Sequence, residues 1–247
     1  MLKVTILGCG SSLGVPVIGC KCHVCKSKLP YNKRTRSATF IDCDGTKILI
    51  DFGFEIRQQL IDAEITTLDA AILTHDHADH VSGIDNLRAF YINHKKALNL
   101  YTDTETAFRV EKEYQYLFQG FLKMNPINFF ELVTIGNAKI QFFRQHHSNI
   151  GSLGIRTGGL VYSSDVSDFP DESRQYLQNI EIWVLDCFGY GSDNNHAGLD
   201  KVLQWNQQFF PKKILLTNMR HEIDYYNIIA ELPPNIIPLY DGYTFEL

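Results

Sequence analysis

Four potential metal ligands lie within six residues in the segment "THDHADH": His75, His77, Asp79 and His80. They directly follow the apolar run "LDAAIL". Imidazole and carboxylate groups are the usual ligands of Zn²⁺, Mn²⁺ and Fe. In a tight loop alternate side chains point to opposite sides, so His75 and His77 can serve one ion while Asp79 and His80 serve a neighbour. The spacing therefore predicts a centre with two metal ions. The alternative is a polar loop that contains histidines by chance.

A second group of potential ligands is the segment "CKCHVC", which contains Cys20, Cys22 and Cys25. In a cytosolic chain of this size, clustered cysteines favour a metal site over a disulfide framework. The three other cysteines are scattered along the chain, and we expect them to be small buried hydrophobic residues.

The elements that must position these groups alternate along the chain. "LKVTILG" is expected to be a strand, "SATFIDCDGTKILID" a hairpin around Asp44-Gly45, and "EIRQQLIDAEI" a helix. The second half contains five expected strands and two expected helices: "AKIQFFRQ", "GSLGIRTGG", "LVYSSD", "IEIWVLDC" and "KKILLTN", with "DESRQYLQN" and "GLDKVLQWNQQFF". "IIPLYDGYTFEL" is expected to be a closing strand pair, whereas "FLKMNPINFFELVTIG" is poorly periodic. The pattern predicts an α/β (α+β) sandwich of two sheets flanked by helices, in one domain over residues 1–247. A doubly wound sheet remains open from the pattern alone.

Composition limits the classes of function. The chain has 247 residues, 45% of them hydrophobic, which is enough for a sizeable core. A net charge of −5 argues against broad nucleic-acid binding, so nucleic acid is not an expected partner. No apolar stretch is long enough for a membrane span, and the first residues do not resemble a signal peptide, so we expect a cytoplasmic protein. The stretch "FLKMNPINFF" could line a substrate pocket or form the contact of a homodimer.

"LTHDHADHVSG" resembles the HxHxDH signature of the metallo-β-lactamase fold superfamily. This resemblance implies a four-layer αβ/βα sandwich with a di-metal centre at the top of its two sheets. It also implies a further ligand at His147, preferred over His146, and a bridging carboxylate at Asp165. Asp51 in "ILIDFG" would hold a ligand imidazole in the required tautomer.

The same resemblance implies a last histidine ligand at the end of a late strand, where this chain has Asn218. One ion would then be held by His75, His77, His147 and Asp165, and the other by Asp79, His80, Asp165 and Asn218. An amide oxygen can bind a hard ion but lacks the affinity of imidazole for Zn²⁺. We therefore expect unequal occupancy, a preference for Mn²⁺ at the second position, or one ion only.

"LGCGSSLGVPVIGCKCHVC", followed by "NKRTRSA", is similar to the branch of the superfamily that includes the phosphoribosyl 1,2-cyclic phosphate phosphodiesterase of the carbon–phosphorus lyase pathway. That branch implies a structural zinc site on the loop at about residues 20–25. Its ligands would be Cys20, Cys22, Cys25 and His221. His221 and Asn218 would then serve two different sites on opposite sides of one short turn.

His196, in "NHAGLDKVL", stands where that branch has a histidine that faces the substrate phosphate. A histidine with a pKa near neutrality suits protonation of a leaving alkoxide. The alternative is a histidine that caps the helix beginning near Leu199. His196 and the ligand Asp79 are the predicted catalytic residues.

These observations predict a metal-dependent hydrolase, specifically a phosphodiesterase that acts on a small cyclic phosphate or a nucleotide-like phosphodiester. The implied cofactors are one structural Zn²⁺ and one or two Zn²⁺ or Mn²⁺ ions at the active site. A lactonase, thioesterase or nuclease on the same fold is the first alternative, because a fold does not determine a reaction. A catalytically weakened metal-binding protein is the second, and Asn218 is the feature that favours it.

Overall fold

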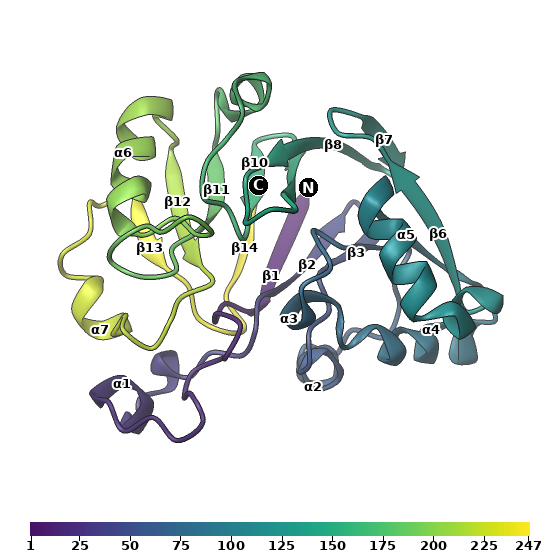
Figure 1. Ribbon diagram of the computed structural model, residues 1–247, viewed down its shortest axis with the longest axis horizontal. Helices are drawn as coiled ribbons and strands as arrows, with labels where there is room; N and C mark the ends of the chain where they lie inside the picture. The colour runs from purple at the N-terminus through teal and green to yellow at the C-terminus, as the bar shows by residue number, and fades with distance from the viewer.

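Two β-sheets of seven strands each form the centre of the molecule in the computed structural model, which describes residues 1–247. Figure 1 shows helices α2 to α5 outside the first sheet and helices α6 and α7 outside the second. The predicted αβ/βα sandwich is therefore confirmed. No helix combines the length and apolar character needed to span a membrane.

The first sheet has the strand order β14-β1-β2-β3-β4-β5-β6. Its strands are β1 (Leu2–Gly8), β2 (Ala38–Cys43), β3 (Thr46–Ile50), β4 (Ala70–Ile72), β5 (Leu98–Asp103), β6 (Leu122–Ile127) and β14 (Thr244–Glu246). Strands β3 to β6 are parallel, and the others pair antiparallel. The helices of this half are α1 (His23–Lys26), α2 (Ile56–Asp62), α3 (Ala78–Val81), α4 (Arg88–His94) and α5 (Thr104–Glu113), with 3₁₀ turns at Pro30–Asn32, Ile84–Leu87 and Gln115–Gln119.

The second sheet has the order β13-β12-β11-β10-β9-β8-β7. Its strands are β7 (Leu132–Ile135), β8 (Ala138–Gln145), β9 (Ser152–Thr157), β10 (Leu160–Ser163), β11 (Ile182–Asp186), β12 (Lys213–Thr217) and β13 (Ile236–Pro238). Strands β10 to β13 are parallel, and β7 to β10 pair antiparallel. The helices are α6 (Leu199–Phe209) and α7 (Tyr225–Ile228), with a 3₁₀ turn at Asp171–Leu177.

Alternation along β3 divides the apolar residues between two cores. Ile48 and Ile50 belong to the large core, which also extends to Trp183 of β11 where that side chain packs against α6. Leu49 points to the other face and joins the smaller core under the helices of the first half. Because successive side chains of a strand face opposite sides, a run of three apolar residues can serve both cores.

Three parts of the chain differ from the sequence prediction. The poorly periodic stretch after Gly120 forms β6 and β7, which are edge strands of the two sheets, and an edge strand needs less apolar patterning. The predicted closing strand pair is wrong, because β13 pairs with β12 and β14 pairs with β1, in different sheets. The expected helix at "DESRQYLQN" is a 3₁₀ turn. The hairpin around Asp44-Gly45 is confirmed.

The loop after β3 packs directly against the short helix α3. The amide of Phe52 donates to the carbonyl of His80 at 2.7 Å, and that of Gly83 donates to the carbonyl of Phe52 at 2.8 Å. A Cβ atom at Gly53 would lie 1.9 Å from the carbonyl oxygen of Asp79. Glycine is therefore required at position 53 for this close approach.

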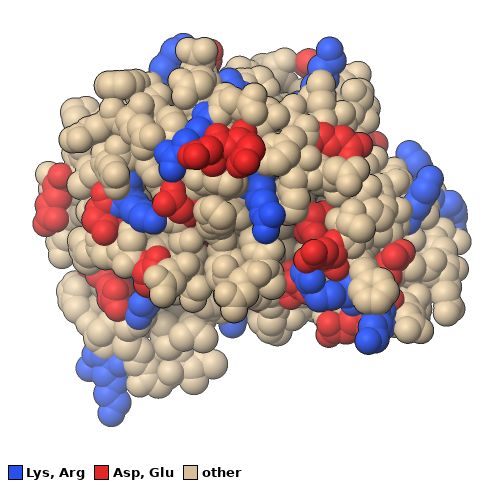
Figure 2. Space-filling view, turned by 45° about the horizontal axis from the view of Figure 1, so that its top comes forward, with Lys and Arg blue, Asp and Glu red and all other residues tan.

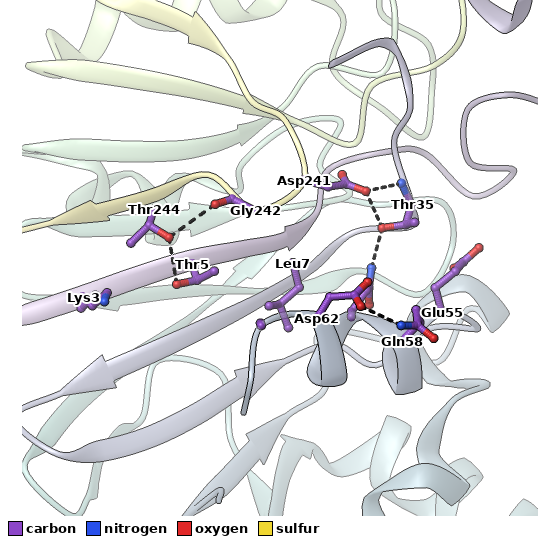
Figure 3. A pocket seen from close by; sticks show the side chains of 12 residues that line it. Lys3, Thr5, Leu7, Thr35, Glu55, Gln58, Asp62, Asp241, Gly242 and Thr244 are labelled. Carbon is purple, nitrogen blue, oxygen red and sulfur yellow. Dashed lines mark hydrogen bonds between the residues drawn. The ribbon is translucent and has the colours of Figure 1, made fainter. Parts of the chain in front are cut away.

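A cavity of about 530 Å³ lies on the outer side of the first sheet, between α2 and strands β1 and β14 (Figure 3). Its lining is mostly polar. Asp241 is tied down there by two hydrogen bonds of 2.7 Å from the amide and hydroxyl of Thr35. None of the predicted metal ligands lines this cavity, so it is separate from the predicted centre.

We expect Gly53→Ala to destabilise the protein, because the added methyl group meets the backbone of Asp79 and not a movable side chain. The expected loss is about 1–3 kcal/mol, as for overpacked interiors, seen as a lower midpoint of thermal unfolding. Gly191→Ala is the control, since a Cβ atom there has no neighbour within 4 Å. Equal stability of the two variants would contradict the close packing of this loop.

Candidate metal centre

Asp51 follows β3, and its fully buried carboxylate positions two of the predicted ligand imidazoles, one directly and one through the hydroxyl of Thr74. Its Oδ2 atom lies 2.8 Å from Nδ1 of His80. The hydroxyl of Thr74 donates to the same carboxylate and lies 3.0 Å from Nδ1 of His75, from which it can accept. Both rings are thereby fixed with the Nδ1 proton outward, which leaves the Nε2 lone pairs free.

The free nitrogen of His80 faces two carboxylates. Nε2 of His80 lies 2.9 Å from Asp165 and 3.3 Å from Asp79. In the neutral ring Nε2 carries a lone pair, and this lone pair faces those of the carboxylate oxygens, with no proton between the atoms. Nε2 of His75 is also buried without a hydrogen-bond partner. Such an arrangement is stable only with positive charge among these atoms.

His147 completes the cluster from the second sheet. Its Nδ1 donates to the carbonyl of Asn195 at 2.8 Å, and its Nε2 lies 3.0 Å from Nδ1 of His77. Ligand atoms of His75, His77 and His147 lie within 4.8 Å of one another, as do those of His75, His80 and Asp165. The neighbouring His146 is exposed. The structure thus brings together the six predicted histidine and aspartate ligands.

The charge balance of the cluster fits divalent cations. Burial alone would lower the pKa of His80, but Asp165, Asp51 and Asp79 outweigh it and raise this pKa well above its usual value. Burial holds the pKa of His75 well below its usual value. Without a metal ion, a proton on His80 would supply the positive charge that the carboxylates require. A bound cation would replace this proton and leave the imidazoles as neutral nitrogen donors. This donor set suits divalent transition metals, and it does not by itself identify the ion.

Asp186, at the end of β11, is a member of the site that the sequence analysis missed. Its buried carboxylate lies 2.9 Å from Nδ1 of His196 and accepts the amide of Val166 at 3.0 Å. Burial raises the pKa of Asp186 to about 6, against the opposing effect of His196. Burial would lower the pKa of His196, but Asp186 and then Asp165 outweigh it and raise it to about 9. Because the pKa of His196 lies above that of Asp186, the proton between them belongs to the imidazole ring.

The ring of His196 is held between the centre and an aromatic side chain. It stacks on Phe188 with a centroid distance of 3.9 Å and an interplanar angle of 7°. Its Nδ1 lies 3.6 Å from Asp165, and ligand atoms of His147, Asp165 and His196 also lie within 4.8 Å of one another. His196 therefore stands at the edge of the cluster, where it can exchange a proton with a bound molecule or serve as a further ligand.

Asn218, predicted as a weak last ligand, is buried beside Asp186. Its amide nitrogen donates to Oδ1 of Asp186 at 3.2 Å and lies 3.5 Å from Nδ1 of His196. Only the carbonyl oxygen of the amide is left for an ion. Its role as a metal ligand stays a prediction.

Three residues of the site have a left-handed backbone. Asp51, Asp165 and Asn218 have φ angles of 58°, 50° and 58°, and each follows the end of a strand. Asn and Asp tolerate this conformation better than most residues. The turn of the backbone directs these side chains across the ends of the strands, where the two sheets meet.

The three clustered cysteines and His221 form a second, separate group. Sγ atoms of Cys20 and Cys22 lie 3.6 Å and 3.4 Å from Nδ1 of His221, and the four ligand atoms lie within 4.8 Å of one another. Tetrahedral zinc with its usual bond lengths separates such atoms by about 3.6–3.8 Å. The amide of Cys25, and then His221, lower the pKa of Cys22 to about 6, whereas burial raises that of Cys25 to about 11. The group fits a zinc ion.

The segment that joins Asn218 to His221 is fixed by a buried cation. The guanidinium of Arg34 donates to the carbonyls of Arg220 and Ile223 at 3.0 Å and 2.8 Å. The amide of Arg220 donates in turn to the carbonyl of Phe188, which stacks on His196. Asn218 and His221 thus lie in different groups at the two ends of one turn, and that turn also contacts Phe188, the ring support of His196.

Comparison with known proteins agrees with this geometry. Residues 46–219 match the model of the beta-lactamase superfamily domain. The chain is similar to a solved structure described as a new diphosphatase from the PhnP family, with 30% identity and a TM-score of 0.94 over 100% of this chain and 97% of that one.

Two curated relatives carry other names. An "Octanoyltransferase" of Porphyromonas gingivalis is 29% identical over 98% of this chain, which spans about half (51%) of that protein's length. The "Anti-Pycsar protein Apyc1" of Paenibacillus xerothermodurans is 36% identical over 82% of each chain.

We expect Asp51→Asn to weaken metal binding at the centre, because the amide cannot accept from both His80 and Thr74 as the carboxylate does. A loss of about 10–100-fold in Mn²⁺ or Zn²⁺ affinity, measured by titration calorimetry, is typical for such supporting residues. The control is Asp76→Asn, since Asp76 lies within the same motif but pairs with Arg109. Unchanged affinity in Asp51→Asn would contradict the assigned role.

We expect Cys22→Ser to remove one zinc ion per chain and to lower the midpoint of thermal unfolding, because metal binding contributes to folding free energy. Metal analysis should show the ions of the histidine cluster retained. Cys43→Ser, outside the cysteine group, serves as the control. Simultaneous loss of both kinds of metal would show that the two sites are not independent.

Proposed function

Because the chain belongs to the beta-lactamase superfamily domain family, in its PhnP-like branch, we propose that it is a metal-dependent phosphodiesterase. Its substrate would be a small cyclic phosphate or a nucleotide-like phosphodiester. The observation that supports the proposal is the Asp186–His196 pair beside the metal-ligand cluster, because it would provide a proton donor for a phosphate bound at the cluster.

The proposed cofactors follow from the two ligand groups. One structural Zn²⁺ would be held by the cysteine group, and one or two Zn²⁺ or Mn²⁺ ions by the histidine cluster. Ions bound in the cluster would stabilise the negative charge on the phosphate oxygens. The remaining chemistry belongs to side chains of this chain.

Hydrolysis requires one proton to leave the attacking water and one to reach the departing oxygen. Asp79, whose carboxylate keeps some exposure to solvent, is placed to accept the first. His196 would give the second from Nε2 as the phosphorus–oxygen bond breaks, while its Nδ1–H stays on the ring and donates to Asp186. A buried carboxylate that orients an imidazole in this way also stabilises its charged form.

The comparisons support phosphate chemistry through the diphosphatase described for the PhnP family. Lactonase, thioesterase and nuclease activities would use the same cluster, so substrate tests must separate them. On the face drawn in Figure 2, acidic and basic side chains are interspersed, without the continuous basic stripe that favours nucleic acid. Asn218 favours the remaining alternative, a metal-binding protein with weakened activity.

We expect the Mn²⁺-loaded protein to hydrolyse bis(p-nitrophenyl) phosphate, and His147→Ala to lose this activity together with bound metal. His146→Ala is the matched control, because His146 is exposed next to His147 and should keep both activity and metal. Cleavage of carboxylic or thioesters, but not of the phosphodiester, would support the other hydrolases. No turnover in a metal-replete sample would support the weakened metal-binding protein.

A further inference from the structure

Asn218 donates a hydrogen bond to the Asp186 carboxylate, which in turn contacts the ring of His196. The amide nitrogen of Asn218 donates to Oδ1 of Asp186 at 3.2 Å, while Oδ2 of Asp186 lies 2.9 Å from Nδ1 of His196. The amide of Val166 also donates to Oδ2. Oδ1 therefore depends on Asn218, and both residues are buried, so no bulk water is at hand to replace this donor.

A side-chain amide has one donor end and one acceptor end. At position 218 the donor end is committed to Asp186, so the residue has a function that is independent of any ion. We infer that Asn218 is a positioning residue: it fixes Asp186 and, through Asp186, the orientation of the His196 ring. This inference rests on the proposed role of His196 as proton donor.

The stack behind His196 explains why Asp186 must be fixed. Phe188 supports one face of the ring, with Arg220 lying over the Phe188 ring at 5.0 Å. Stacking restrains the plane of the ring but leaves open a 180° flip about the Cβ–Cγ bond, which would exchange Nδ1 with Cδ2. The hydrogen bond between Nδ1 and the Asp186 carboxylate selects one of these two orientations, provided that the carboxylate itself cannot turn. Asn218 and Val166, one on each oxygen, prevent that turn.

The variant Asn218→Asp separates a role as metal ligand from the positioning role. The side chain keeps nearly the same shape, but the two roles predict opposite effects on the reaction rate. A carboxylate is a better metal ligand than an amide, so a ligand role predicts tighter metal binding and a faster reaction. A carboxylate cannot donate to Asp186 and would repel it, so the positioning role predicts a slower reaction at equal or tighter metal binding.

The leaving group provides the readout. We would compare methyl p-nitrophenyl phosphate, whose leaving anion needs no proton, with methyl phenyl phosphate, whose phenol has a pKa of about 10. Proton donation by a side chain typically contributes about 10²–10⁴-fold. We expect Asn218→Asp to lower kcat for the phenyl ester by at least about tenfold more than for the nitrophenyl ester, with Mn²⁺ affinity maintained.

Asn218→His is the matched variant, because an imidazole N–H can still donate to Asp186. It should keep the ratio of the two rates within about threefold, whatever it does to metal affinity. Asn218→Ala, which removes the donor, repeats the test if Asn218→Asp fails to fold, as judged by thermal unfolding and by the zinc content of the cysteine group. Equal losses on both esters, or a loss of metal affinity that accounts for the lower rate, would overturn the inference.

A second readout does not depend on activity. In the zinc-loaded protein, the Nδ1 proton of His196 should give a downfield nuclear magnetic resonance signal that is absent in His196→Ala. We expect this signal to persist in Asn218→His and to shift or broaden in Asn218→Asp. An unchanged signal in Asn218→Asp would overturn the positioning role. Failure of the wild-type protein to cleave either ester would instead overturn the proposed function.

Discussion

Buried lone pairs that face one another impose the main constraint on this molecule. The Nε2 atoms of His75 and His80 and the carboxylate of Asp165 meet in a buried interior, with the partly exposed carboxylate of Asp79 at its edge. Without positive charge among them, burying these nitrogens and carboxylates would cost a large desolvation energy that no interaction offsets. The surrounding structure is consistent with that demand, because Asp51 and the carbonyl of Asn195 turn the ring protons away from the centre. The sandwich supplies the rigid strand ends from which these groups project.

Local sequence determined the parts of the site that lie close together in the chain. His75, His77, Asp79 and His80 occupy one loop after a buried strand, and they could be assigned as ligands from their spacing alone. His147 and Asp165 required the family resemblance, because each comes from a distant strand end. Asp186 was missed because a single aspartate in "VLDC" has no spacing pattern and its partner lies ten residues further on. The available signal was the position of Asp186 at the end of a buried strand. That strand is parallel to its neighbour β12, which ends just before Asn218.

The fold shows the same division between local and distant information. The hairpin of β2 and β3 and the periodic helices α2 and α6 were predicted correctly. The edge strands β6 and β7 were missed because a strand with only one neighbour needs little apolar patterning. The final two strands were wrongly paired because sequence neighbours need not be sheet neighbours. The turn at Asp241-Gly242 instead carries the chain from one sheet to the other, and Asp241 is anchored there by Thr35.

The backbone at position 218 has a consequence for how this centre can change over evolutionary time. Gly, Asn and Asp adopt a φ near 58° with the least strain, and His does so less readily. Of these, Asn, Asp and His have a side chain that can bind an ion or form a hydrogen bond, whereas Gly has none. A single nucleotide change can exchange His, Asn and Asp for one another. Exchanges among these three residues would keep a polar side chain at this turn, next to Asp186.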